Sequence, residues 1–371
     1  MRRTSKATVL VVLLCVVELA IRPGMAESQP TTPWRDPSPH VARSVVVDTD
    51  VYLEVLDWGG KGPPLVLLAG LGNTAHIFDD FAPKLTARHH VYGITRRGFG
   101  TSSIPATGYS ADRLGDDVLA VLSALKINRP LLVGHSLAGE ELSSIGSRFP
   151  NRVAGLVYME ATYGYAYYDR VKGYLPMDVR ELRKELDSLI RSPDPAKITR
   201  DLLAKDLPAF ESVLRHQTPA PLPPGEGPSA ADSSSFGALA DWFAKTRGIR
   251  IPEEELRSQR VPTHDAHPGP LKTPAFVFEA INDGQRKFTK LDVPILAICA
   301  VPISLGATKR TISGSLIATY EANQAAQVDA FERGVHSARV VRIRDADHYV
   351  FLSNEAEVIR DIEMFAEQLQ R

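Results

Sequence analysis

The stretch Gly134-His135-Ser136-Leu137-Ala138-Gly139 decides the fold that we predict for this chain. It follows the apolar run Pro130-Leu131-Leu132-Val133 and opens a segment in which apolar residues recur with helical spacing. A strand, a tight turn that holds a serine, and a helix together form a nucleophile elbow. Small residues flank the serine because so tight a turn leaves no room for larger side chains. The pattern predicts that Ser136 presents its hydroxyl at the carboxyl end of a buried strand.

Apolar runs alternate with amphipathic segments along the rest of the chain. A hairpin is predicted around Thr49-Asp50, and buried strands are predicted at 65–69, 91–94, 131–133, 153–159, 295–299 and 340–343. Helical patterns occupy 111–125, 315–333 and 355–369. Short, continuously apolar strands separated by helices predict an α/β fold, with a mostly parallel sheet that is covered by helices on both faces.

The alternation stops between residues 161 and 290, where no run resembles a buried strand. Amphipathic helical pieces and joints rich in proline and glycine fill this interval instead. We therefore expect residues 161–290 to form a mainly helical cap, or lid, inserted into a core made of residues 44–160 and 291–371. An irregular linker is the alternative, above all for residues 219–235.

The first 26 residues have the features of a secretory signal peptide. Basic residues precede an apolar stretch, and Gly24-Met25-Ala26 offers small residues for cleavage after Ala26. An uncleaved anchor is the alternative, although the apolar stretch is short for a membrane span of about 20 residues. Residues 27–43 are expected to be a flexible lead-in. We therefore expect an exported protein, periplasmic or secreted, without stable membrane insertion.

Composition argues against several other classes of protein. The formal net charge of −1 offers no basic footprint for nucleic acid or for an anionic membrane. Cys15 lies in the expected signal peptide, so Cys299 would have no disulfide partner and a large core must supply the stability. His264 and His267 lie in a proline-rich loop, and no cysteine or histidine spacing indicates a strong metal site. We therefore expect no metal and no organic cofactor.

The order of these motifs resembles that of the α/β-hydrolase superfamily over residues 44–371 outside the cap. The resemblance implies an oxyanion hole, in which two backbone amides bind the negatively charged oxygen of an intermediate. One donor would be the amide of Leu137, directly after the serine, and the other that of Leu71 in the glycine-rich turn 69–73. The turn 96–102 is similar to the family's Arg-Gly-x-Gly-x-Ser turn, and we interpret it as structural support for the elbow.

The same resemblance implies a catalytic triad. His348 is the expected general base, because it lies in a loop after the last strand and imidazole exchanges protons near neutral pH. Most of the superfamily places the acid after the strand that corresponds to 295–299, but residues 300–320 contain no Asp or Glu. Glu160, at the end of the strand 153–159, offers the position used in some branches. We expect Glu160 to be the acid, and an acid elsewhere is the alternative.

Glu140 and Glu141 lie in the first turn after the serine. Carboxylates there interact favourably with the helix dipole, which is the interpretation that we prefer. A role of Glu140 in shaping the acyl site is the alternative.

The resemblance implies a serine hydrolase that cleaves a carboxylic ester through an acyl-enzyme. A lactonase, amidase, thioesterase or C–C bond hydrolase would use the same triad, and a non-catalytic binding protein on this fold is the alternative from another class. The expected partner is a small ester-like molecule, and the oligomeric state stays open. Aromatic residues of the cap would contact an apolar or aromatic part of the substrate, or else form the cap's own core: Tyr163, Tyr165, Tyr167, Tyr168, Trp242 and Phe243.

Overall fold

The structure is a computed structural model that describes residues 34–215, 227–306 and 312–370. The expected signal peptide, residues 1–26, and residues 27–33 of the expected lead-in lie outside these ranges. No helix within them is both long and apolar enough to cross a membrane.

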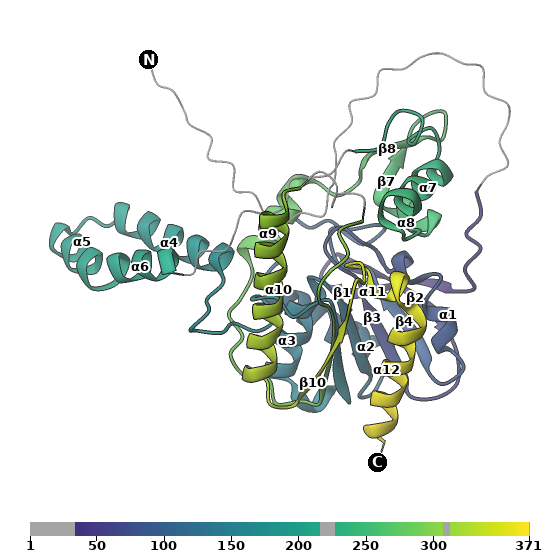
Figure 1. Ribbon diagram of the computed structural model, residues 1–371, viewed down its shortest axis with the longest axis horizontal. Coiled ribbons are helices and arrows are strands. Elements are labelled where there is room, and N and C mark those ends of the chain that lie inside the picture. Colours follow the sequence, from purple (N-terminus) through teal and green to yellow (C-terminus); the bar gives the residue numbers. More distant parts are fainter. Residues whose placement is uncertain (1–33, 216–226, 307–311, 371) are drawn as a thin grey trace.

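An eight-stranded sheet forms the centre of the molecule (Figure 1). Its strands are β1 (Val41–Asp48), β2 (Val51–Gly59), β3 (Pro64–Leu68), β4 (His90–Ile94), β5 (Leu131–His135), β6 (Gly155–Met159), β9 (Ile295–Ala300) and β10 (Ala338–Ile343). Their order in space is β1-β2-β4-β3-β5-β6-β9-β10. Strand β2 is antiparallel to β1 and β4, and the strands from β4 to β10 are parallel to their neighbours. The expected mostly parallel sheet is confirmed.

Helices cover both faces of this sheet, as expected. One face packs against α2 (Ala111–Ala124), α3 (Ala138–Arg148) and α10 (Gly314–Gly334). The other packs against η1 (Ala75–Phe78), α1 (Ala82–Leu85), α11 (Val350–Ser353) and α12 (Glu355–Gln368). Successive residues of β3 alternate between the two cores, because side chains along a strand point to opposite faces: Val66 lies in the first core and Leu67 in the second.

Between β6 and β9 the chain forms two groups of elements that lie apart in Figure 1. The first group extends to the side of the sheet and holds α4 (Leu175–Ile190), α5 (Pro195–Asp201), η3 (Leu202–Asp206) and α6 (Leu207–Arg215). The second group holds α7 (Phe236–Arg247), α8 (Glu253–Gln259), β7 (Arg260–Pro262) and β8 (Pro268–Leu271), and α8 contacts η1. Helix α9 (Ala275–Asp283) then leads back to the core. The interval is mainly helical, and its action as a cap stays a prediction.

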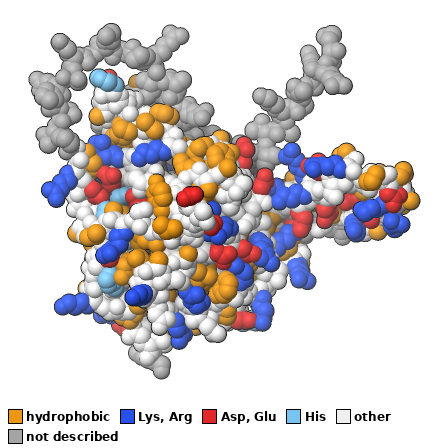
Figure 2. All heavy atoms as spheres, turned by 180° about the vertical axis from the view of Figure 1, so that it is seen from behind, with side chains coloured by type: hydrophobic (Ala, Val, Ile, Leu, Met, Phe, Trp, Pro, Cys, Tyr) orange, Lys and Arg blue, Asp and Glu red, His pale blue; other side chains and the backbone are white. Residues whose placement is uncertain are grey.

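The group α4–α6 has little core of its own. Figure 2 shows basic, acidic and apolar side chains mixed on its surface. Leu203 is 63% exposed and Ile190 is 79% exposed, and no residue of α5 is buried. The second group contacts η1 through α8, and Glu255 of α8 accepts hydrogen bonds from Asn73 and Thr74 in the loop after β3.

Strand β1 begins at Val41, which pairs with Asp57 of β2. The segment before it also contacts the sheet, since the Trp58 indole donates a hydrogen bond of 3.0 Å to the hydroxyl of Ser38. The flexible lead-in expected for residues 27–43 therefore does not extend over residues 34–43. The polar contacts that hold this segment come from residues distant in sequence, which composition alone does not reveal.

Gly139, in the first turn of α3, lies where this helix touches the chain that leaves β6. A Cβ atom at this position would lie 2.3 Å from the carbonyl oxygen of Ala161. We expect Gly139→Ala to lower the free energy of unfolding by about 1–3 kcal/mol through overpacking, measured by chemical denaturation. Gly237→Ala in α7 is the matched control, because its nearest contact would be an ordinary 3.6 Å. Equal effects of the two substitutions would contradict this account of Gly139.

Candidate active site

Ser136 lies in a strained turn at the carboxyl end of β5. Its φ angle is +53°, in the left-handed region that costs a residue with a side chain about 1–3 kcal/mol. The Ser136 amide donates a 3.1 Å hydrogen bond to the carbonyl of Met159 in β6, and the Ser136 carbonyl accepts one of 3.0 Å from the amide of Gly139. These two bonds hold the turn between the neighbouring strand and the start of α3.

The two amides expected to form the oxyanion hole lie in loops that meet at this turn. A Cβ atom built on Gly70 would lie 3.2 Å from the Cβ of Ser136, so the loop after β3 touches the elbow. Leu137 is the residue directly before α3. Within the described residues, neither the Leu71 amide nor the Leu137 amide donates a hydrogen bond. Both N–H groups are therefore available to a ligand, and their role stays a prediction.

A buried arginine supports both loops. Arg96, which follows β4, donates to the two carboxylate oxygens of Glu141 at 2.6 and 2.7 Å. The same guanidinium donates to the carbonyls of Ala69 at 2.8 Å and Gly70 at 3.3 Å. Both side chains of the ion pair are 4% exposed. Arg96 thus connects the loop that carries Leu71 to the helix that follows the serine.

Glu140, by contrast, is fully buried and has no partner. Neither of its carboxylate oxygens makes a hydrogen bond within the described part of the chain. Burial raises the pKa of Glu140 well above its usual range; the charge of Glu141 acts in the same direction, and Arg96 and Arg180 oppose it. From the sequence we prefer a favourable interaction with the helix dipole for both Glu140 and Glu141. The structure instead shows Glu141 in a buried ion pair and Glu140 buried without a hydrogen-bond partner among the described residues. Both lie in the first turn of the helix, so their sequence positions could not reveal this difference.

His348 lies in the turn between β10 and α11, and it packs against His135 at the end of β5. The His348 carbonyl accepts a 3.0 Å hydrogen bond from the Nε2 of His135, and the ring centroids lie 4.7 Å apart. The Nε2 of His348 is buried and makes no hydrogen bond to any described residue. Burial lowers the pKa of His348 well below its usual value, and His135 and Arg247 act in the same direction. The imidazole is therefore neutral near pH 7, the form in which it can accept a proton.

Glu160 directly follows β6, has a φ angle of +46° and is 4% exposed. Its Oε2 accepts a 2.6 Å hydrogen bond from the amide of Ala300, and its Oε1 accepts from Gln324 at 2.9 Å and from Tyr163 at 3.1 Å. Burial raises the pKa of Glu160 to about 7, although these three hydrogen bonds act to lower it. Because a carboxylate oxygen has two acceptor sites, Oε2 can accept one more hydrogen bond.

The structure brings Ser136, His348 and Glu160 to one edge of the sheet without joining them by hydrogen bonds. Strands β5 and β6 pair with His135 opposite Met159, so Ser136 and Glu160 leave adjacent strands at the same level. No hydrogen bond within the described residues links the His348 imidazole to either residue. Asp347, the neighbouring carboxylate, is occupied by the guanidinium of Arg247 at 2.7 Å. The triad therefore stays a prediction.

Tyr163 and Tyr165 lie beside these residues. Their rings stack with centroids 5.5 Å apart, and the ring of Tyr163 lies 6.4 Å from that of His348. The hydroxyl of Tyr165 interacts with Ser136. The other cap aromatics make packing contacts of their own: Tyr167 with Phe331, Tyr168 with Lys287, and Trp242 with Phe243.

Replacing Glu140 or Glu141 with the neutral residue Gln should change the stability of the protein in opposite directions. Because folding raises the pKa of Glu140, the unfolded chain loses this proton first and stability falls as the pH rises above about 4.3. Glu140→Gln should remove that loss, so that Tm declines less steeply between about pH 5 and 8. Glu141→Gln should lower the free energy of unfolding by about 3–5 kcal/mol, because it leaves the Arg96 charge buried without its partner. A Glu140→Gln protein whose Tm falls as steeply with pH as that of the unmodified protein would contradict this account.

Comparisons with known proteins agree with this geometry. Residues 63–209 match the sequence family described as alpha/beta hydrolase fold. The 2-(acetamidomethylene)succinate hydrolase of Mesorhizobium japonicum is 28% identical over 103 residues, which are 28% of this chain and 37% of that protein. The dihydrolipoyllysine-residue acetyltransferase component of the acetoin cleaving system of Pseudomonas putida is 31% identical over 165 residues, 43% of this chain and 44% of that protein. The chain thus matches less than half the length of these curated relatives.

Solved structures match over a larger part of the chain. E-2-(acetamidomethylene)succinate hydrolase has a TM-score of 0.58 and 19% identity, covering 88% of this chain and 99% of that one. The esterase RhEst1 from Rhodococcus sp. ECU1013 has a TM-score of 0.54 and 17% identity, covering 88% and 99%. Identities this low show a common fold and no more. The chain therefore has the α/β-hydrolase fold, and its residues 63–209 match the sequence family of that description.

Proposed function

We propose that the protein is a serine hydrolase that cleaves carboxylic esters through an acyl-enzyme. The observation that carries this proposal is the strained elbow of Ser136, whose φ angle is +53° and which lies between two loops with available amides. Backbone strain of this kind persists only where the surrounding structure enforces it, and it is common at catalytic residues. Here the hydrogen bonds to Met159 and Gly139 enforce it.

In the proposed reaction the Ser136 hydroxyl oxygen attacks the ester carbonyl carbon, and the Nε2 of His348 takes the hydroxyl proton. The amides of Leu71 and Leu137 donate to the oxyanion of the tetrahedral intermediate. The intermediate collapses with loss of the alcohol, which receives the proton from His348. Water then attacks the acyl-enzyme by the same route, releases the acid and restores the serine hydroxyl.

Glu160 would stabilise the imidazolium form of His348 during these steps. The remaining acceptor site on its Oε2 supports this assignment, as does its position at the strand adjacent to the serine. Catalytic hydrogen bonds are often long or poorly aligned without substrate and tighten in the complex. We therefore propose that the Glu160–His348 and Ser136–His348 hydrogen bonds form when an ester binds.

Ring faces beside the site favour an apolar or aromatic group in the substrate. Tyr163 and Tyr165 offer such faces next to Ser136 and His348. A solved structure of similar fold, Est816, is described as an N-acyl homoserine lactone degrading enzyme, with a TM-score of 0.52 and 20% identity. Lactones are cyclic esters, so they form a second class of candidate substrates. We further propose that the protein acts after export on a small molecule.

A panel of p-nitrophenyl esters, followed by aryl lactones, tests the proposal. We expect Ser136→Ala to reduce kcat/KM by about 1,000-fold or more, since the nucleophile is lost. Ser147→Ala, in the helix that follows the elbow, is the matched control, because among the described residues its hydroxyl bonds the carbonyl of Lys290 at the surface. Hydrolysis that survives in Ser136→Ala, or that is lost equally in Ser147→Ala, would contradict the proposed nucleophile.

The pH profile tests the acid. Because the pKa of Glu160 is raised to about 7, its carboxylate form is lost as the pH falls through that value. We expect kcat/KM of the unmodified protein to fall over the same pH range, which gives its pH profile an acidic limb near pH 7. Glu160→Gln should reduce kcat by about 100-fold or more and remove the limb, leaving residual activity that persists to lower pH. An unchanged limb near pH 7 in Glu160→Gln would place the acid elsewhere.

A further inference from the structure

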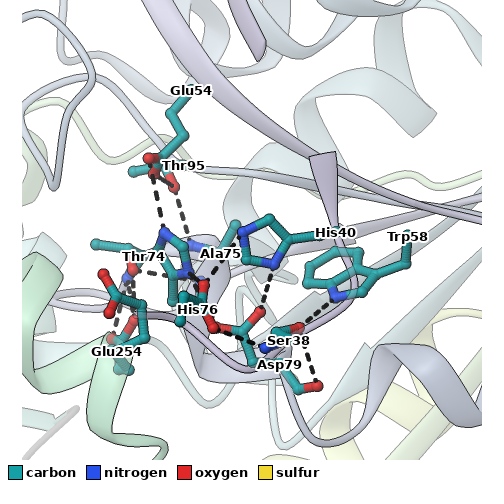
Figure 3. A network of polar contacts seen from close by, with 12 residues as sticks. Ser38, His40, Glu54, Trp58, Thr74, Ala75, His76, Asp79, Thr95 and Glu254 are labelled. Atoms are coloured by element: carbon teal, nitrogen blue, oxygen red, sulfur yellow. Dashed lines mark hydrogen bonds and ion pairs between the residues drawn. The ribbon is translucent and has the colours of Figure 1, made fainter. Parts of the chain in front are cut away.

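Two histidines and two aspartates meet at a point that the proposed reaction does not use. Asp36 and His40 belong to the segment before β1, His76 lies in η1, and Asp79 is the residue that ends η1. Figure 3 shows the rings of His40 and His76 on either side of the carboxylate of Asp79. The side chains of His40, His76 and Asp79 are 8%, 7% and 5% exposed, and that of Asp36 is 22% exposed.

The possible ligand atoms lie at short and similar separations. The Nδ1 of His76 is 2.9 Å from Asp79 Oδ2 and 3.6 Å from Asp36 Oδ2. His40 places its Nδ1 3.1 Å from Asp79 Oδ1 and its Nε2 3.2 Å from Asp36 Oδ2. One atom from each of the four residues can be chosen so that all lie within 4.8 Å of one another.

These separations suit a small four-coordinate metal ion. Zn²⁺ binds histidine nitrogen and carboxylate oxygen at about 2.0–2.2 Å, so tetrahedral geometry places its ligands about 3.3–3.6 Å apart. The shorter distances in the cluster would open slightly around an ion, and each histidine would direct one nitrogen to it. Two carboxylates would balance the charge of a divalent cation, and each imidazole would bind it in the neutral form after releasing any proton to solvent.

Two further observations distinguish the cluster from an ordinary group of surface charges. The Oδ2 atom of Asp36 is buried, and its contacts with His40 and His76 do not have the geometry of hydrogen bonds. Behind His76, the carboxylate of Glu54 faces the Nε2 at 3.7 Å and accepts hydrogen bonds from Thr95 and Thr101. Histidines that bind metals commonly direct their second nitrogen to a carboxylate, which orients the ring and increases its basicity.

We propose that Asp36, His40, His76 and Asp79 form a binding site for one Zn²⁺ ion. The ion would fasten the segment before β1 to η1, which directly follows the loop that carries Leu71. Its role would therefore be structural. The two pairs, Asp36-x-x-x-His40 and His76-x-x-Asp79, are the sequence signal, but only the fold brings them together.

Zinc titration of the purified protein tests this proposal. After treatment with a chelator and its removal, ZnCl₂ is titrated in competition with a chromophoric chelator, and bound metal is counted by elemental analysis. We expect one Zn²⁺ per chain and a higher Tm with zinc. Asp36→Asn and His40→Ala should each weaken binding by about 100-fold or more, because loss of even a supporting group costs about 10- to 100-fold.

His90→Ala is the matched control. It removes another histidine–aspartate pair, with His90 Nε2 2.8 Å from Asp57 Oδ1, and should leave zinc binding unchanged. Circular dichroism shows whether each variant folds. Absence of binding, or equal affinity in Asp36→Asn, His40→Ala and the unmodified protein, would overturn the proposal and leave a network of ion pairs.

Substitution by Co²⁺ gives a readout that needs no variant. CoCl₂ added to the unmodified, metal-free protein should produce the intense visible absorption of four-coordinate cobalt, and ZnCl₂ should abolish it. The weak spectrum of six-coordinate cobalt, or an intense spectrum that zinc does not displace, would contradict the site.

Discussion

The bidentate ion pair between Arg96 and Glu141 is the interaction on which the candidate active site depends. Taking both charges out of water is costly, and the cost is offset only where every donor finds a good acceptor. Arg96 adds to the ion pair two hydrogen bonds, to the carbonyls of Ala69 and Gly70. One side chain therefore fixes the loop after β3 relative to α3. Because the two proposed oxyanion donors are backbone amides in these elements, their separation depends on this pair.

Burial sets the charge state of the remaining groups. Ser136 and His348 are each 8% exposed, and Glu160 is 4% exposed. Burial lowers the pKa of His348 and raises that of Glu160 to about 7. In a site so poorly solvated, an ionised side chain is unfavourable before substrate binds. When charge develops on the reacting groups, backbone dipoles that already point at it stabilise it without having to reorient. The same burial makes the unpartnered Glu140 a source of instability at higher pH.

The sequence predicted the sheet and the elbow because both leave local signals. Buried parallel strands read as continuous apolar runs, and a serine turn between a strand and a helix needs small neighbours such as Gly134 and Gly139. Contacts between distant residues leave no such signal. The partner of Glu141 depends on how α3 meets the loop after β4, and the meeting of His40 with His76 depends on how the segment before β1 packs against η1.

The same limit applies to the catalytic assignments. Ser136 and Glu160 could be placed at one sheet edge because they end adjacent parallel strands, and His348 because it follows the last one. Side-chain orientation is a different matter, since it is set by packing. Glu160 accepts hydrogen bonds from Ala300, Gln324 and Tyr163, and none of these could be inferred from the position of Glu160 in the sequence.

The most direct test of the central claim is mass spectrometry of the protein after reaction with a fluorophosphonate, which phosphonylates an activated serine. The account predicts one covalent adduct, located on the peptide that contains Ser136 and absent from Ser136→Ala. No adduct, or an adduct on another serine that persists in Ser136→Ala, would contradict Ser136 as the nucleophile.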